Sequence, residues 1–98
     1  MIHQRKFADV STRLARFLLD QAAGHAQAIN GGRQLRLPLA LTHQEMANLL
    51  GTTRETLTST LNRFVDAGIL AVESRGTLLV KAPAELRARA HVEPYADD

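Results

Sequence analysis

Apolar residues recur at helical spacing in two short segments near the middle of the chain. The apolar positions of the first segment are Met46, Leu49 and Leu50. Their intervals of three and four residues predict a helix with one face that packs against the protein interior. Thr42 and Glu45 are spaced as a capping box, which places the helix start at Thr42. Gly51 can adopt the left-handed conformation that ends a helix.

A second helical pattern follows directly and ends at Gly68. Its apolar positions are Leu57, Leu61, Phe64 and Val65. Thr52 and Glu55 have the spacing of another capping box, which is one way to start this helix. Two helices joined by a short turn that contains glycine are typical of a helix-turn-helix, in which the second helix enters the DNA major groove.

The segments before this helix pair predict a helix and a strand. The apolar stripe of the helix consists of Val10, Leu14, Phe17 and Leu18. Asp9 or Ser11 can cap its start, and its end is expected near Ala23. Gly31 and Gly32 then predict a loop or hairpin tip. Residues 34–41 alternate polar and apolar side chains up to Pro38, which favours an edge strand because proline cannot donate to an interior ladder.

The segment after the helix pair predicts a β-hairpin. Two apolar, β-favouring runs in residues 69–81 flank Ser74, Arg75 and Gly76. A hairpin in this place is a wing. Pro83 suits the first turn of a short last helix that ends at Ala90. The predicted fold is α+β, a winged helix-turn-helix with three main helices, a small antiparallel sheet and a short carboxy-terminal helix. We expect residues 1–8 to end a longer helix, residues 9–90 to form the domain, and residues 91–98 to fray.

Composition and motifs argue against an enzyme. The 98 residues suffice for one domain with a modest core, and they include no cysteine. None of the patterns GxSxG, P-loop or GxGxxG occurs, and the four histidines lack the spacing of metal ligands. We therefore expect no catalytic site and no metal site. No apolar run approaches the roughly 18 residues of a membrane span, so the expected location is the cytoplasm.

The second helix of the pair carries the candidate chemistry. Arg54 lies in its first turn, where the positive end of the helix dipole disfavours a cation, so an external anion or a guanine edge would suit it. Glu55 can accept from the amino group of cytosine, or it can be a structural first-turn acid. The hydroxyl residues that follow are Thr56, Thr58, Ser59 and Thr60. They suit either a face that contacts DNA or a polar face in solvent. Arg63 and Arg75 can neutralise phosphates, or they can be ordinary solvated arginines.

The segment THQEMANLLGTTRETLTSTLNRFVDAGIL, residues 42–70, resembles the winged-helix DNA-binding domain of the Crp/Fnr transcription regulators. The resemblance extends upstream over residues 7–22, which look like the end of the family's dimer helix, a hinge at Asp9 and the first helix of the domain. Downstream it extends through the wing to Leu86. The family's amino-terminal effector domain is absent from the chain. The resemblance therefore implies no cofactor here, since an effector would bind in that missing domain.

The resemblance also implies roles for individual residues. It implies base contacts by Arg54 and Glu55, and Thr58 and Ser59 belong to the same predicted base-reading surface. The implied phosphate contacts are Thr42, His43, Thr53 and Thr56, to which the charge argument adds Arg63 and Arg75. Ser59 departs from the family, which usually has a second arginine at this position, and serine cannot make a bidentate guanine contact.

The expected partner is double-stranded DNA, in the form of a palindromic operator read by a homodimer of the full-length regulator. RNA polymerase is a further candidate partner. The net charge of only +2 limits counterion release, so a single protomer is expected to bind weakly. The alternative is a winged helix that binds another protein and not DNA.

Overall fold

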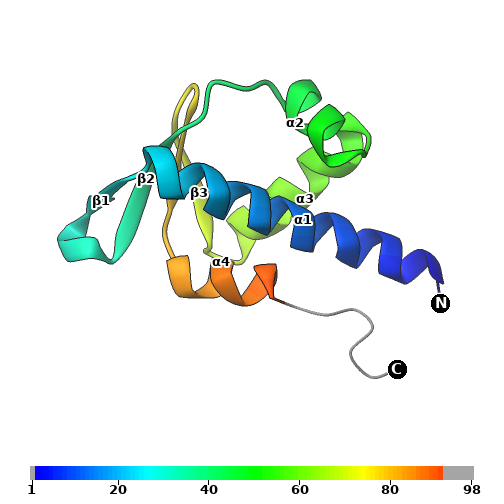
Figure 1. Cartoon of the computed structure of the whole chain (residues 1–98), viewed down its shortest axis with the longest axis horizontal. Helices are drawn as coiled ribbons and strands as arrows, with labels where there is room; N and C mark the ends of the chain where they lie inside the picture. Colours follow the sequence, from blue (N-terminus) through cyan, green and yellow to red (C-terminus); the bar gives the residue numbers. More distant parts are fainter. Residues whose placement is uncertain (1, 92–98) are drawn as a thin grey trace.

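The computed structural model describes the backbone of residues 2–91 and the side chains of residues 10–91. Four α-helices, one short 3-10 helix and four strands follow one another in these residues. In chain order they are α1 (Ile2–His25), β1 (Gln27–Ile29), η1 (Asn30–Gly32), β2 (Gln34–Pro38), α2 (His43–Leu50), α3 (Arg54–Asp66), β3 (Leu70–Ser74), β4 (Thr77–Val80) and α4 (Pro83–Ala90). The α+β winged helix-turn-helix predicted from the pattern is confirmed (Figure 1).

Helix α1 is longer than the sequence pattern predicted. It continues without a break from Ile2 to His25, so the expected caps at Asp9 or Ser11 are wrong, whereas its end at His25 lies close to the expected position near Ala23. The physical reason is that residues 2–23 contain neither glycine nor proline, and isolated aspartate and serine residues only weakly disfavour a helix interior. Of the tail predicted at residues 91–98, all but His91 lies outside the described residues.

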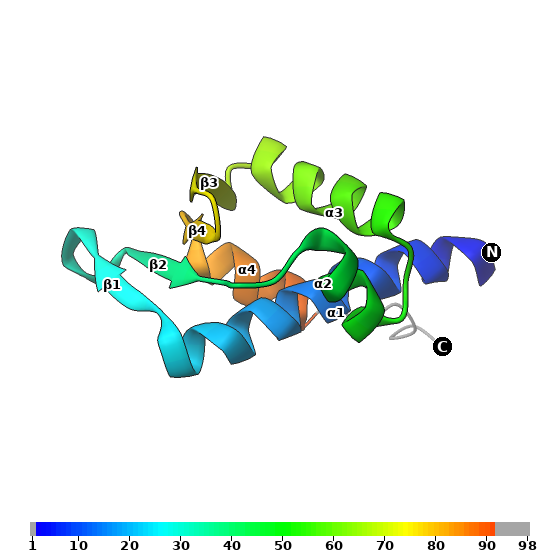
Figure 2. The same ribbon diagram turned by 90° about the horizontal axis from the view of Figure 1, so that it is seen from above.

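The strands form one antiparallel sheet in the order β1-β2-β4-β3. Strand β2 pairs with both β1 and β4, so the prediction of an edge strand is wrong. The sheet tolerates Pro38 because it is the last residue of β2, and the next amide, that of Leu39, donates to the Gly76 carbonyl at 2.7 Å. Strand β1 lies in a segment that the sequence predicted only as a loop. The predicted hairpin tip at Gly31 and Gly32 is confirmed, and Figure 2 shows this hairpin extending beyond the helices.

The core lies where α1, α3, α4 and the sheet meet. Its largest fully buried side chains include Leu14, Leu18, Leu37, Leu57, Phe64, Val80 and Leu86. Two residues predicted to be buried are instead exposed, Leu49 by 63% and Val65 by 37%. Each lies roughly a quarter turn from the centre of its helix's buried face, at 100° per residue. Spacing alone gives the apolar stripe, but only the neighbouring elements decide how much of it they cover.

The first helix of the motif, α2, is fixed at both ends as the sequence predicted. The Thr42 side chain accepts from the Glu45 amide at 3.0 Å, and the Glu45 carboxylate accepts from the Thr42 amide at 2.8 Å. Gly51 ends α2 in the left-handed conformation with φ of 69°. The Arg13 guanidinium donates to the Leu50 carbonyl next to this turn. Helix α1 is thereby attached to the end of α2, which fixes where α3 begins.

An ion pair joins the two strands on either side of β4. Nε and Nη2 of Arg36 on β2 each donate at 2.8 Å to the carboxylate of Glu73 on β3. The hydrogen bonds from Arg36 lower the pKa of Glu73 below its usual value, and the same pair raises the pKa of Arg36. Arg36 stays charged throughout the accessible range, so Glu73 determines the pH response of the pair.

We expect Glu73→Gln to destabilise the protein near neutral pH and to have no effect in strong acid. Because the pKa of Glu73 is lower in the folded state, its contribution is present above the unfolded pKa and is lost as the pH falls through the folded pKa. Urea unfolding of both proteins across this range measures the difference. Asp20→Asn, which removes an exposed carboxylate of α1 outside this pair, is the control. A difference that persisted unchanged below the folded pKa would contradict the ion-pair account.

Candidate nucleic-acid interface

Helix α3 begins at a threonine cap. The Thr53 hydroxyl accepts from the Thr56 amide at 3.1 Å and donates to the Thr56 hydroxyl at 3.0 Å. The cap is therefore Thr53, and the capping box predicted between Thr52 and Glu55 is wrong. Glu55 is consequently not used as a capping residue, and its side chain is exposed in the first turn beside Arg54. Two oppositely charged side chains thus stand at the exposed start of this helix.

One face of α3 is an open, shallow depression lined only by polar side chains. Its residues are Arg54, Glu55, Thr58, Ser59 and Asn62. They recur at intervals of three and four on the side opposite Leu57 and Phe64, which are buried in the core. The structure therefore brings together all four predicted base-reading residues. It adds Asn62, which the sequence analysis missed, although its position four residues after Thr58 was a usable signal.

The hydroxyl residues of α3 have different surroundings. Thr60 is fully buried, and its hydroxyl donates to the Thr56 carbonyl at 2.7 Å. The expectation that it belongs to a DNA-facing surface is therefore wrong, because bonding to the preceding turn satisfies the hydroxyl. Thr56 is half-buried beside the cap, whereas Ser59 is exposed and Thr58 is half-buried. Only Thr58 and Ser59 bring hydroxyl groups to the depression.

A histidine at the start of α2 is bonded to Thr58, one of the residues that line the depression. Thr42 and His43 are both exposed, and Nδ1 of His43 lies 3.0 Å from the Thr58 hydroxyl oxygen. This hydrogen bond links the first turn of α2 to the middle of α3, across the helix-turn-helix. His43 was predicted to contact a phosphate and Thr58 to contact a base, and a hydrogen bond joins the two side chains.

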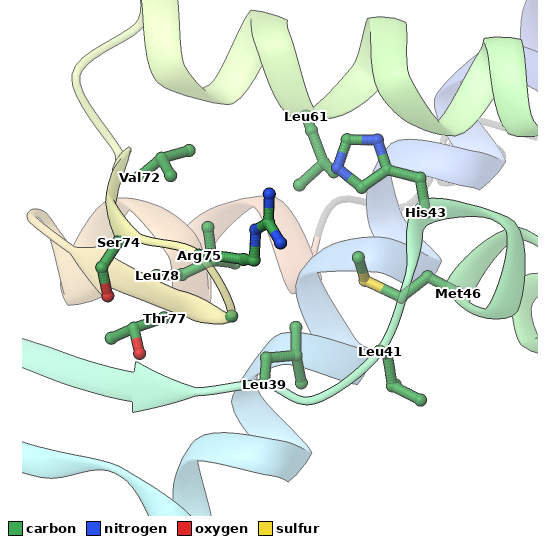
Figure 3. A pocket seen from close by; sticks show the side chains of 11 residues that line it. Leu39, Leu41, His43, Met46, Leu61, Val72, Ser74, Arg75, Thr77 and Leu78 are labelled. Carbon is green, nitrogen blue, oxygen red and sulfur yellow. The ribbon is translucent and has the colours of Figure 1, made fainter.

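Arg75 stands at the turn of the wing, the hairpin of β3 and β4. It lines a pocket of about 120 Å³ between the wing and the helix pair. Figure 3 shows its side chain reaching from the hairpin turn over this pocket, whose lining includes His43 and Leu61. The second arginine predicted to contact phosphate, Arg63, is exposed in the last turn of α3 but does not line the depression. The wing arginine thus lies near the helix pair, and Arg63 lies on a different face of α3.

The described residues show neither a metal site nor a membrane span. No group of three or more histidine, cysteine, aspartate or glutamate side chains is placed to hold a metal ion within this part of the chain. None of the helices described is both long and apolar enough to cross a bilayer.

Comparison with known sequences identifies the family to which this chain belongs. Residues 12–89 match the family described as the Crp-like helix-turn-helix domain. The chain belongs to this family. It is also 33% identical over 76 residues to the nitrogen fixation regulation protein FixK of Rhizobium meliloti (strain 1021). The match covers 78% of this chain and 33% of FixK.

Solved structures agree with the sequence match. The CO-dependent transcription factor CooA from Carboxydothermus hydrogenoformans superposes with a TM-score of 0.80 and 35% identity, over 91% of this chain and 40% of CooA. FixK2 from Bradyrhizobium japonicum gives a TM-score of 0.71 at 21% identity, over 86% of this chain and 39% of FixK2, and so supports the fold alone. The chain spans well under half the length of these relatives. The resemblance to the DNA-binding domain of Crp/Fnr regulators is confirmed.

Proposed function

We propose that this chain binds double-stranded DNA selectively, with α3 in the major groove, as the DNA-binding domain of a Crp/Fnr-type transcription regulator. The observation that carries the proposal is the polar face of α3. Arg54, Glu55, Thr58, Ser59 and Asn62 share one open depression, on the side of α3 opposite the buried side chains of Leu57 and Phe64. A helix that reads the major groove contacts base edges with exposed polar side chains near its amino-terminal end, and α3 has such a face.

The chemistry of this face suits base edges. The Arg54 fork matches the two acceptors of guanine, and the Glu55 carboxylate can accept from the amino group of cytosine. Together they can read the two bases of one pair or of adjacent pairs. Ser59 has a single hydroxyl donor and cannot make a bidentate contact with guanine, so we expect the base pair opposite it to be read less strictly.

The groups that surround this face suit phosphates. The starts of α2 and α3 are the positive ends of the two helix dipoles, which favour an anion. The Thr42 hydroxyl accepts in its cap and keeps its own proton to donate, and the same holds for Thr56, which accepts from Thr53. We propose that Thr42, His43, Thr53 and Thr56 contact phosphates at the groove edge, with Arg63 and Arg75 contributing charge on either side.

The longer regulator to which such a domain belongs is also a matter of proposal. We propose a cytoplasmic homodimer that reads a palindromic operator with half-sites about one helical turn apart. The net charge of +2 supports the dimer, because one protomer offers few charges for phosphate neutralisation. An effector would bind in a separate domain, RNA polymerase would be a partner at the promoter, and the chain itself would catalyse no reaction.

Selection of bound duplexes from a random pool, followed by titration at several salt concentrations, tests the proposal. We expect a defined half-site of a few base pairs to be enriched. We also expect the logarithm of the binding constant to fall linearly with the logarithm of salt concentration, because phosphate contacts release counterions. A protein-interaction module would enrich no sequence. That outcome would reject the proposal in favour of the alternative.

A further inference from the structure

The hydrogen bond between His43 and Thr58 determines which group of Thr58 can face a ligand. A threonine side chain carries two groups on its β-carbon, a hydroxyl and a methyl. The Thr58 hydroxyl lies 3.0 Å from Nδ1 of His43, and either tautomer of the imidazole can make this bond as donor or acceptor. In both cases the hydroxyl is directed at α2. The methyl group is then the part of Thr58 that is left for the depression.

The surroundings of Thr58 make this methyl distinctive. It shares the depression with Arg54, Glu55, Ser59 and Asn62, which are exposed and carry charged, hydroxyl or amide groups. Thr58 is half-buried, so its side chain has limited freedom, and its side-chain torsion is restricted further by branching at the β-carbon. The bond to His43 selects one of the remaining orientations. Among the five residues that line the depression, Thr58 alone carries a methyl group, and its side chain is held from α2.

We propose that the methyl of Thr58 contacts the 5-methyl group of a thymine in each half-site, with His43 as the residue that positions it. Thymine is the only standard base that presents a methyl group in the major groove, and a threonine methyl is a suitable contact for it. The inference rests on the proposed function, since it requires α3 to lie in that groove. It adds a base identity that Arg54 and Glu55 do not specify, read through an apolar contact.

The test removes one methyl group at a time from each side of this contact. Each thymine of the selected operator is replaced in turn by uracil, which lacks only the methyl, and binding is measured at fixed salt. With the unaltered protein, replacement of one particular thymine in each half-site is expected to weaken binding about fourfold per half-site. This is the effect expected from the loss of one buried methyl group. Thr58→Ser keeps the hydroxyl and removes the methyl. It is expected to bind the thymine and uracil operators equally.

Variants of His43 test the positioning role. His43→Ala is expected to weaken binding to every duplex, because a phosphate contact is lost, and also to reduce the ratio between thymine and uracil operators at the sensitive position. His43→Asn keeps a polar atom near the place of Nδ1 and is expected to restore that ratio. The ratio separates positioning from general affinity, because a phosphate contact acts equally on both operators.

Three results would overturn the proposal while leaving the proposed function intact. They are an unaltered protein that is insensitive to uracil at every position, a Thr58→Ser variant that keeps the full thymine preference, and a His43→Ala variant with an unchanged ratio. Failure to bind any sequence selectively would instead reject the proposed function itself. The two failures are therefore distinguishable.

Discussion

Replacing Arg54 with alanine is expected to weaken binding to the selected half-site about 5- to 150-fold and to relax the preference at one base pair. A bidentate contact between arginine and guanine discriminates against other bases by about 1 to 3 kcal/mol, and a tenfold change in affinity corresponds to about 1.36 kcal/mol. Arg54 is exposed in the first turn of α3 and lines the depression. Titrations against the half-site and its single-base variants, at one salt concentration, measure both effects.

Two further variants identify the cause. Arg54→Lys keeps the positive charge but loses the planar fork, so it should recover little of the base preference. Arg87→Ala removes an equal charge from the exposed surface of α4, outside the depression. We expect it to change affinity slightly and preference not at all. Equal losses of affinity from Arg54→Ala and Arg87→Ala, with base preference unchanged in both, would show that Arg54 contributes only charge.

Replacing Phe64 with alanine is expected to lower the free energy of unfolding by about 3 to 5 kcal/mol. Truncating a buried phenylalanine loses its transfer free energy and leaves a cavity. Phe64 is only 1% exposed, and the guanidinium of Arg89 lies 5.7 Å from the centre of its ring. A domain of this size is stabilised by only about 5 to 15 kcal/mol. Urea unfolding is therefore expected to show a variant that is partly unfolded under mild conditions.

The neighbouring residue provides the control for this variant. Val65 is apolar and belongs to the same helix, but it is 37% exposed. We expect Val65→Ala to cost far less than Phe64→Ala, because solvent can occupy the space of the deleted methyl groups. Similar losses for both variants would mean that α3 is packed differently from the structure described. Retained DNA binding by folded Phe64→Ala protein would show that the core supports the interface only through stability.

The helix pair was predictable because its signals are local. Capping at Thr42 and the left-handed turn at Gly51 each depend on residues within one turn of one another, so neither requires contact with a distant segment. The same holds for the wing turn at Gly76, where φ is 80°. Arg54 was identifiable as a candidate site residue because a cation in the first turn conflicts with the helix dipole.

Elements that depend on pairing or coverage were predicted less well. Strand β2 was expected at the edge of the sheet, but its position depends on where β1 and β4 lie, and β1 has too few residues to show a pattern. For α1 the sequence predicted a helix start at Asp9 or Ser11 where the helix is unbroken, because residues that can cap a helix can also lie within one. For β2 the local preference was weak, and contacts with distant segments decided the outcome.

The sequence by itself thus determined the helix-turn-helix, the wing and the charged start of α3, because short-range capping, turn and spacing preferences specify them. Only the tertiary structure decided which hydroxyls face the interface. It buried Thr60, left Thr58 and Ser59 on the depression, and added Asn62 to it. It also joined His43 to Thr58 across 15 positions of sequence. The physical reason is that burial and hydrogen bonding between helices depend on how α2 and α3 pack, which no single helix specifies.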